Sequence, residues 1–149
     1  MATERLNPYS AFNFIVAMGD GKEGELIGGF SDVSGLGKEV NYSEYRNGNE
    51  SFNTVRKIPN TFKVDDVTLK RGLVGSTNLF EWLTNVANGE EDRRQITITL
   101  LDEAREEVAS WVLREAQPKK WTGPTLAAKG GGEVAMEELS FVHEGVTYE

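Results

Sequence analysis

Alternating hydrophobic and polar residues cover most of this chain, and such alternation predicts β-strands with one buried face. The clearest run places Phe12, Phe14 and Val16 on one side of a strand. The Gly-Asp-Gly-Lys sequence at 19–22 predicts a tight turn, which makes a hairpin of the first forty residues. The predicted strands cover residues 12–18, 25–33, 38–46, 62–70, 94–101, 108–115 and 133–142.

One segment, residues 78–88, has the period of an amphipathic helix. Asn78 is its predicted N-cap, Glu81 completes a capping-box-like pair, and Gly89 follows where a helix commonly ends. The face that we expect to pack on the core contains Leu79, Trp82, Leu83 and Val86. A set of seven or eight strands with one helix predicts a mainly β fold, either a β-barrel or two packed antiparallel sheets with one flanking α-helix.

The predicted strand at 38–46 has no cleanly hydrophobic face. Val40, Tyr42, Glu44 and Arg46 point to one side, and Glu39, Asn41, Ser43 and Tyr45 point to the other. A strand of an ordinary sandwich has one apolar face. The mixed pattern is typical of a sheet edge, an oligomer interface or the wall of a water-filled channel.

The following segment, residues 47–60, is polar and asparagine-rich, and Pro59 ends it. Connections of this length are uncommon within a compact domain unless they have a function. Phe52, Val55 and Ile58 are spaced along it, so we expect this segment to dock on a neighbouring subunit or ring, with Lys57 and Pro59 in the same contact. The alternative is a disordered surface loop.

Composition limits the function classes. The 149 residues are enough for one domain with its own core, so we expect a single domain at 1–149. A net charge of −8 argues against nucleic-acid binding, because phosphate backbones repel such a surface. The chain has no cysteine and no apolar run of membrane-helix or signal-peptide type, so we expect synthesis in the cytoplasm and no membrane anchoring.

Motifs for catalysis are weak throughout. The Gly-Leu-Gly-Lys sequence at 35–38 lacks the earlier glycine and the Ser or Thr of a phosphate-binding loop. His143 is the only histidine, and the neighbouring acids Asp65 and Asp66 would point to opposite faces of a strand. We therefore expect no catalytic residues, no cofactor and no metal site. Trp121 is expected to be partly exposed, where it could anchor a partner.

A set of short motifs follows a fixed order along the chain. The motifs are Phe-Ser-Asp-Val-Ser-Gly-Leu at 30–36, Glu-Tyr-Arg at 44–46, Lys-Ile-Pro-Asn at 57–60, Leu-Lys-Arg-Gly at 69–72, Phe-Glu-Trp at 80–82, Arg-Arg-Gln-Ile at 93–96, Leu-Asp-Glu at 101–103, Trp-Val-Leu at 111–113 and Glu-Leu at 138–139. No single motif is specific, but the ordered set extends from the first strand to the last. This set resembles the tail tube protein of contractile phage tails and of phage-tail-like, extracellular contractile injection systems.

The resemblance implies a structural protomer with a fold like that of the type VI secretion tube. Six subunits would form a ring whose joined strands make one barrel around a channel, and stacked rings would form a rigid hollow tube within a contractile sheath. Implied partners are further copies of the chain, the sheath protein, baseplate or spike-hub proteins and tube-capping proteins. Cargo or DNA would pass through the lumen without specific binding.

In such a tube, the polar residues Glu39, Asn41 and Ser43 are expected to line the lumen, with Val40 and Tyr42 pointing into the protein layer. A one-residue change of register would reverse this assignment. The alternatives are a tube-initiating or baseplate-proximal paralogue and, in a different class, a small-ligand-binding β-barrel. A virion, a released particle and a cell-anchored particle all remain compatible with the sequence.

Overall fold

The computed structural model describes residues 6–19, 25–26, 30–49, 55–73, 75, 77–130 and 134–149. Residues 20–22 of the predicted turn and Phe52 of the predicted docking segment lie outside these residues. Within them, no helix is long and apolar enough to span a membrane. The elements are β1 (Phe14–Gly19), β2 (Glu25–Leu26), β3 (Asp32–Ser34), β4 (Lys38–Tyr45), β5 (Arg56–Val64), β6 (Val67–Gly72), α1 (Asn78–Ala87), β7 (Arg94–Leu101), β8 (Glu107–Thr122), β9 (Met136–Val142) and β10 (Gly145–Tyr148).

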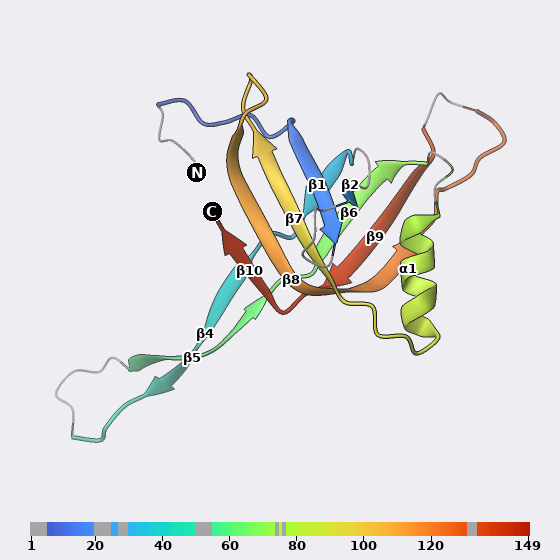
Figure 1. The fold of residues 1–149 in the computed structure, drawn as a ribbon. Coiled ribbons are helices and arrows are strands. Elements are labelled where there is room, and N and C mark those ends of the chain that lie inside the picture. Colours follow the sequence, from blue (N-terminus) through green and yellow to red (C-terminus); the bar gives the residue numbers. More distant parts are fainter. Residues whose placement is uncertain are drawn as a thin grey trace.

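A strongly curved antiparallel sheet forms the body of the molecule (Figure 1). Its strands follow the order β2-β1-β7-β8-β9-β6-β3, and β10 pairs with β8. β8 is long enough to join two halves of the sheet. Its first part pairs with β7 and β10, and its last part, from Gln117, pairs with β9. The mainly β fold with one flanking helix is therefore confirmed.

The chain bends between the two parts of β8. Glu115 lies at this point with a φ of 51°, a left-handed conformation that is uncommon outside glycine. The two halves of the sheet thereby face each other around a common core, whose largest fully buried side chains are Trp82, Phe141, Leu69, Leu79, Ile96, Leu113, Leu139, Val16 and Val67. Burying each such side chain contributes about 1.5–3 kcal/mol.

The helix α1 lies against the β8–β9 side of the body (Figure 1). Leu79 and Trp82 are buried, whereas Leu83 and Val86 are half-buried. The predicted N-cap at Asn78 is wrong by one residue: Thr77 is the cap, and its hydroxyl lies 2.8 Å from a carboxylate oxygen of Glu81. Because Thr77 makes no side-chain bond to the helix backbone, the predicted capping box does not form.

Two predicted boundaries around the third and fourth strands are wrong. The predicted loop at 47–60 is shorter, because β5 begins at Arg56 and continues through Pro59. Pro59 has no N–H to donate, and it lies at a register shift of the β4–β5 pair, where a strand tolerates proline. The predicted strand at 62–70 is two strands, since the chain leaves β5 at Val64 and enters β6 at Val67.

Other boundaries differ at bulges and chain ends. The predicted strand at 25–33 is divided into β2, which pairs with β1, and β3, which pairs with β6. β8 continues past the predicted end at residue 115 and includes Pro118, which again lies at a register shift. The last predicted strand begins at Met136, and β10 was not predicted.

Candidate assembly interface

β4 and β5 form a two-stranded sheet of their own and project from the body as an arm (Figure 1). Within the described residues, neither strand joins the main sheet. Every residue of β4 is exposed, as is every residue of β5 except the half-buried Val64. An isolated hairpin is marginally stable in water, because it has no second layer to cover a face. The arm therefore has the character of an element completed by another molecule.

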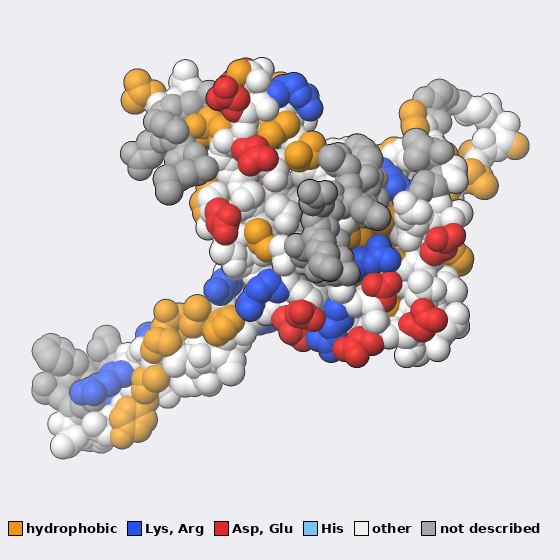
Figure 2. Space-filling view, in the orientation of Figure 1, with side chains coloured by type: hydrophobic (Ala, Val, Ile, Leu, Met, Phe, Trp, Pro, Cys, Tyr) orange, Lys and Arg blue, Asp and Glu red, His pale blue; other side chains and the backbone are white. Residues whose placement is uncertain are grey.

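Strand pairing gives the arm one predominantly hydrophobic side, here called the apolar arm face. Val40 lies opposite Phe62, and Tyr42 lies opposite Pro59. Val40, Tyr42 and Phe62 are 45%, 57% and 61% exposed, so they remain largely in contact with solvent in the single chain. The space-filling view shows hydrophobic side chains following one another along the arm (Figure 2). Such a row typically marks an interaction surface.

Charged side chains lie at both ends of the apolar arm face. The ammonium group of Lys38 lies 5.0 Å from the centre of the Phe62 ring. At the other end, Lys57 donates to the carboxylate of Glu44. This hydrogen bond, with the attraction of the two charges, lowers the pKa of Glu44 below its usual range. These contacts lie along the face and leave its centre open.

The opposite side, here called the polar arm face, contains all three residues that the sequence assigned to a lumen. Glu39 pairs with Lys63 across the strands. The amide of Asn60 donates to the Ser43 hydroxyl at 3.0 Å, and the amide of Asn41 lies 3.4 Å from the Thr61 hydroxyl. The side chains of Glu39, Asn41 and Ser43 thus share one exposed, hydrogen-bonding surface. Toward the tip, this face also contains Tyr45 and Ile58.

A register shift between Val40 and Tyr42 produces this segregation. Asn41 alone stands opposite the two residues Asn60 and Thr61, as in a β-bulge. The bulge brings Pro59 and Phe62 to the same side although three positions separate them. Simple alternation along the sequence would put them on opposite sides. Phe62 was not predicted as an interface residue, because it was assigned to the predicted strand at 62–70 and not to the docking segment at 47–60.

The remaining interface residues of the sequence interpretation also lie on the arm. Val55 precedes β5 and is exposed, and Lys57, Ile58 and Pro59 lie within β5, likewise exposed. None of these four is covered by the chain's own described residues. Phe52 lies outside the described residues.

Charge also distinguishes the arm from the body. Residues 38–64 contain five basic and three acidic side chains, a net charge of +2. Since the whole chain has a net charge of −8, the other residues carry −10. The arm of one copy would therefore be attracted to the body of another, particularly at low ionic strength.

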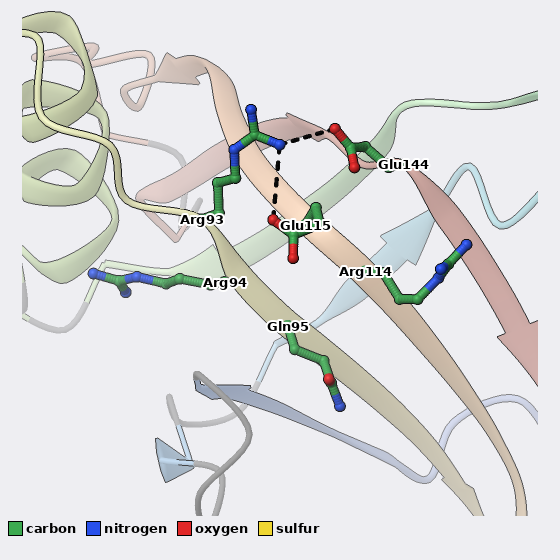
Figure 3. A pocket seen from close by; sticks show the side chains of 6 residues that line it. All are labelled: Arg93, Arg94, Gln95, Arg114, Glu115 and Glu144. Carbon is green, nitrogen blue, oxygen red and sulfur yellow. Dashed lines mark hydrogen bonds and ion pairs between the residues drawn. The ribbon is translucent and has the colours of Figure 1, made fainter.

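A pocket of about 380 Å³ lies at the bend of β8 and is lined by Arg93, Arg94, Gln95, Arg114, Glu115 and Glu144 (Figure 3). Arg93 lies 2.8 Å from Glu144 and 3.7 Å from Glu115, and these carboxylates raise the pKa of Arg93 above its usual range. The ion pairs of Arg93 thus line the pocket and join the start of β7 to β8 and to the β9–β10 turn. It is polar, unlike the apolar interior that a small-ligand barrel needs.

A second set of charged side chains forms a buried ion pair inside the protein. Arg71 pairs with Glu137, with side chains that are 4% and 3% exposed. The indole N–H of Trp121 donates to the other carboxylate oxygen of Glu137 at 3.1 Å, and Arg71 lies over the Phe30 ring at 5.6 Å. Trp121 is half-buried, which agrees with its expected partial exposure, and its indole N–H is bonded within the protein. Among the described residues, no group of three or more His, Cys, Asp or Glu could hold a metal ion.

The curved sheet with one helix, together with a projecting arm whose apolar face is uncovered, has the features of a structural protein with an unoccupied interaction surface. The family model described as the T4-like virus tail tube protein gp19 matches residues 10–147. The chain therefore belongs to this tail tube family. Its geometry agrees with that membership, since tail tubes are built from repeated copies of one protomer.

Solved structures of contractile injection systems contain similar chains. One, in the PVC sheath–tube complex in the extended state, is 27% identical, with a TM-score of 0.83 over 97% of this chain and 93% of that chain. A chain of the PVC sheath/tube terminator is 29% identical, with a TM-score of 0.83 over 96% and 97%. A chain of the anti-feeding prophage tube-terminating cap is 26% identical, with a TM-score of 0.85 over 100% and 95%.

More distant likeness concerns the fold alone. Hcp1 from Flavobacterium johnsoniae is 12% identical, with a TM-score of 0.56 over 90% of this chain and 94% of that chain. A comparison with curated protein sequences found no match. The fold likeness to Hcp1 agrees with the expected tube-like architecture. The protein is a tail tube protein of the contractile injection class.

Proposed function

We propose that the arm joins copies of this tail tube protein into hexameric rings and stacked rings, which form the rigid inner tube of an injection particle. The observation that carries this proposal is the uncovered apolar face of β4 and β5. Complete burial of an aromatic or aliphatic side chain contributes about 1.5–3 kcal/mol. Covering Val40, Tyr42 and Phe62 with a neighbouring copy therefore supplies a driving force that the single chain lacks.

The polar arm face is proposed to line the lumen. Its amide, hydroxyl and carboxylate groups stay hydrated, so they present few apolar contacts to cargo passing through. Asn41 and Ser43 form hydrogen bonds with their own hairpin and do not require a partner. With this face toward the channel, Val40 and Tyr42 point into the protein layer, where they pack.

Partners and location follow from the same role. We expect contacts with a contractile sheath, with baseplate or spike-hub proteins and with a tube-capping protein, while cargo or DNA passes without specific binding. We propose that the protein acts as a building block, because the described part of the chain offers an exposed assembly surface on the arm. Its location is a phage-tail-like particle, which similar chains form extracellularly in the PVC system.

The test uses the double variant Tyr42→Ser and Phe62→Ser, which removes the centre of the apolar arm face. Negative-stain microscopy and sedimentation should show rings or tubes for the unaltered protein, with baseplate proteins added if nucleation is needed. The variant should remain dispersed while its circular dichroism and thermal unfolding stay unchanged, because the body does not use these residues.

The matched control is Asn41→Ala with Ser43→Ala, two changes on the polar arm face of the same hairpin. This control should still assemble. Equal tube yields from the Tyr42/Phe62 variant and the control would show that assembly does not use the apolar arm face. A tube-initiating or baseplate-proximal role, the second candidate, would appear as a ring bound to baseplate proteins on which no further rings of this protein stack.

A further inference from the structure

The pocket at the bend of β8 lies on a β-bulge. A register shift in the β7–β8 pairing leaves Gln95 alone opposite the two residues Arg114 and Glu115. Glu115 has the left-handed φ of 51°, so the backbone of β8 changes direction here. Bulges redirect the side chains that they carry and are common next to functional sites. This bulge places the Arg114 side chain at the wall of the pocket.

Two of the three arginines that line the pocket are already paired. Arg93 lies 2.8 Å from a carboxylate oxygen of Glu144. Arg94 donates to both carboxylate oxygens of Asp92, each at 3.1 Å. Within the described part of the chain, the exposed side chain of Arg114 forms no ion pair and no hydrogen bond. Arg114 is therefore the lining cation whose charge these residues leave unpaired.

Gly145, the first residue of β10, leaves the space in which the Arg114 guanidinium lies. A Cβ atom at position 145 would lie 2.3 Å from Nη2 and 3.1 Å from Nε of Arg114. The guanidinium therefore rests against the backbone of Gly145. Figure 3 shows Arg114 extending in a different direction from Arg93. A planar guanidinium held in this way offers parallel N–H groups that match the two oxygens of a carboxylate.

The β7–β8 turn presents exposed carboxylates at the other end of the same strands (Figure 1). Residues 102–107 contain four acidic side chains and one basic side chain. The Asp102 carboxylate accepts hydrogen bonds from the Ala104 and Glu106 N–H groups, both at 2.9 Å, which fixes the turn. Glu106 and Glu107 are exposed and form no ion pair with any described residue. The turn therefore holds two carboxylates on a well-supported backbone.

The pocket and the turn are too far apart to meet within one chain. β7 runs from Arg94 at the pocket to Leu101 at the turn. At about 3.3 Å per residue, this strand is roughly 23 Å long. Complementary charges at opposite ends of one body favour an end-to-end, head-to-tail contact between copies. Because copies with a net charge of −8 repel one another as a whole, such local pairing also determines how they meet.

We propose that the Arg114 pocket binds a carboxylate of the Glu106–Glu107 pair from the β7–β8 turn of a second copy. The contact joins copies end to end, and its place between successive rings of a tube rests on the proposed function. A single exposed ion pair is weak, but a ring repeats the pair in every subunit, so the contacts reinforce one another.

Crosslinking tests the contact without changing the charges that form it. One protein has Gln95→Cys in the pocket, a second has Ala104→Cys in the turn, and the native chain has no cysteine. The two proteins are mixed at high concentration and treated with a short bismaleimide, whether or not tubes form. The mixture should give crosslinked dimers, whereas each protein treated alone should stay monomeric on a denaturing gel. A mixture with no more dimer than the separate proteins would overturn the proposal.

The crosslink should also depend on Arg114. Adding Arg114→Glu to the Gln95→Cys protein should abolish the dimer, because a carboxylate in the pocket repels the turn. Lys120→Glu makes the same change of charge on an exposed side chain of β8 outside the pocket, and it should leave the crosslink intact. Equal crosslinking in the two variants would show that Arg114 does not hold the contact.

Charge reversal tests the ion pair in the otherwise unaltered chain. Arg114→Glu should prevent the growth of long tubes, and a second change, Glu106→Arg or Glu107→Arg, should restore it by reversing the pair. The matched control combines Arg114→Glu with Asp32→Arg, which has the same net charge but places the new cation on β3, at the other edge of the sheet. Restoration by the control as well, or by neither partner, would overturn the proposed pair.

The result is separable from the role of the arm. Crosslinks in a protein that forms no tubes would uphold the pocket contact and contradict the proposed tube. Tubes that assemble equally well with Arg114→Glu, and without crosslinks, would overturn the pocket contact and leave assembly through the arm intact.

Discussion

Leu79 and Leu83 occupy the same face of α1 but differ in burial. Leu79 is 1% exposed, whereas Leu83 is half-buried. Helical spacing predicts the face and not the depth, because depth depends on which strand lies beneath each position. Trp82 is also buried and donates its indole N–H to the Asp92 carbonyl oxygen at 2.8 Å. Leu79 and Trp82 therefore contribute most of the free energy by which this helix face stabilises the fold.

Truncating these two leucines should reveal the difference. Leu79→Ala is expected to lower the free energy of unfolding by roughly 2–5 kcal/mol, the range for fully buried leucines. Leu83→Ala should cost about half as much, since part of its side chain is already in water. Denaturant melts of the two variants provide the measurement. Equal losses would mean that both side chains are buried to the same depth in solution.

At the scale of elements, the arm and the body follow different rules. The body strands β6 and β9 alternate between buried positions and positions that are mostly half-buried, as expected for one fully covered face. β4 has no buried position at all. Its hairpin is held by strand pairing, by a few side-chain hydrogen bonds and by the tight junction at Gly35. The arm can therefore lose its orientation without unfolding the body.

Gly35→Ala tests this independence. Gly35 has a φ of +95°, and a methyl group there would meet the Asp66 carbonyl oxygen. The variant should reduce tube yield and raise hydrogen exchange at the junction, with little change in the protection of β7 and β8. Gly48→Ala, on the far end of the arm, is the control, because a methyl group there meets nothing within 4 Å. Loss of protection across the whole body would contradict a separable arm.

At the scale of the whole molecule, the arm and the body differ in net charge and in how much of their hydrophobic surface is exposed. A weakly basic arm with an apolar face projects from an acidic body (Figure 2). Two different surfaces that meet between identical copies form a head-to-tail contact, which closes into a ring or continues as a stack. This arrangement suits a tube and offers a reason for the strongly acidic body, which also limits non-specific binding of polyanions.

A cysteine scan tests which arm face lines the lumen. Because the sequence contains no native cysteine, only the introduced thiol can react with the reagent. In assembled tubes, Asn41→Cys and Ser43→Cys should react with small thiol reagents and resist reagents too bulky to enter the bore. Val40→Cys and Tyr42→Cys should be protected in tubes and reactive in dispersed protein. The opposite pattern would reverse the face assignment and leave the tube role intact.

The sequence predicted the fold class and most strand positions, because alternation and helical spacing reflect local contacts with a core. β7 matches its predicted range of residues 94–101, and Gly89 follows α1 in a left-handed conformation, as expected. The errors cluster where chain geometry departs from simple periodicity. Pro59 and Pro118 lie inside strands at register shifts, and such shifts have no reliable local signal.

The sequence by itself determined that the chain is mainly β, acidic and similar to tail tube proteins, since composition, periodicity and motif order are local properties. Only the tertiary structure decided that 38–64 leaves the body as a separate hairpin, and that a bulge gathers Val40, Tyr42, Pro59 and Phe62 on one face. It also brought His143 to Asp65, 78 positions away. Such pairings depend on how distant strands pack, which no local pattern encodes.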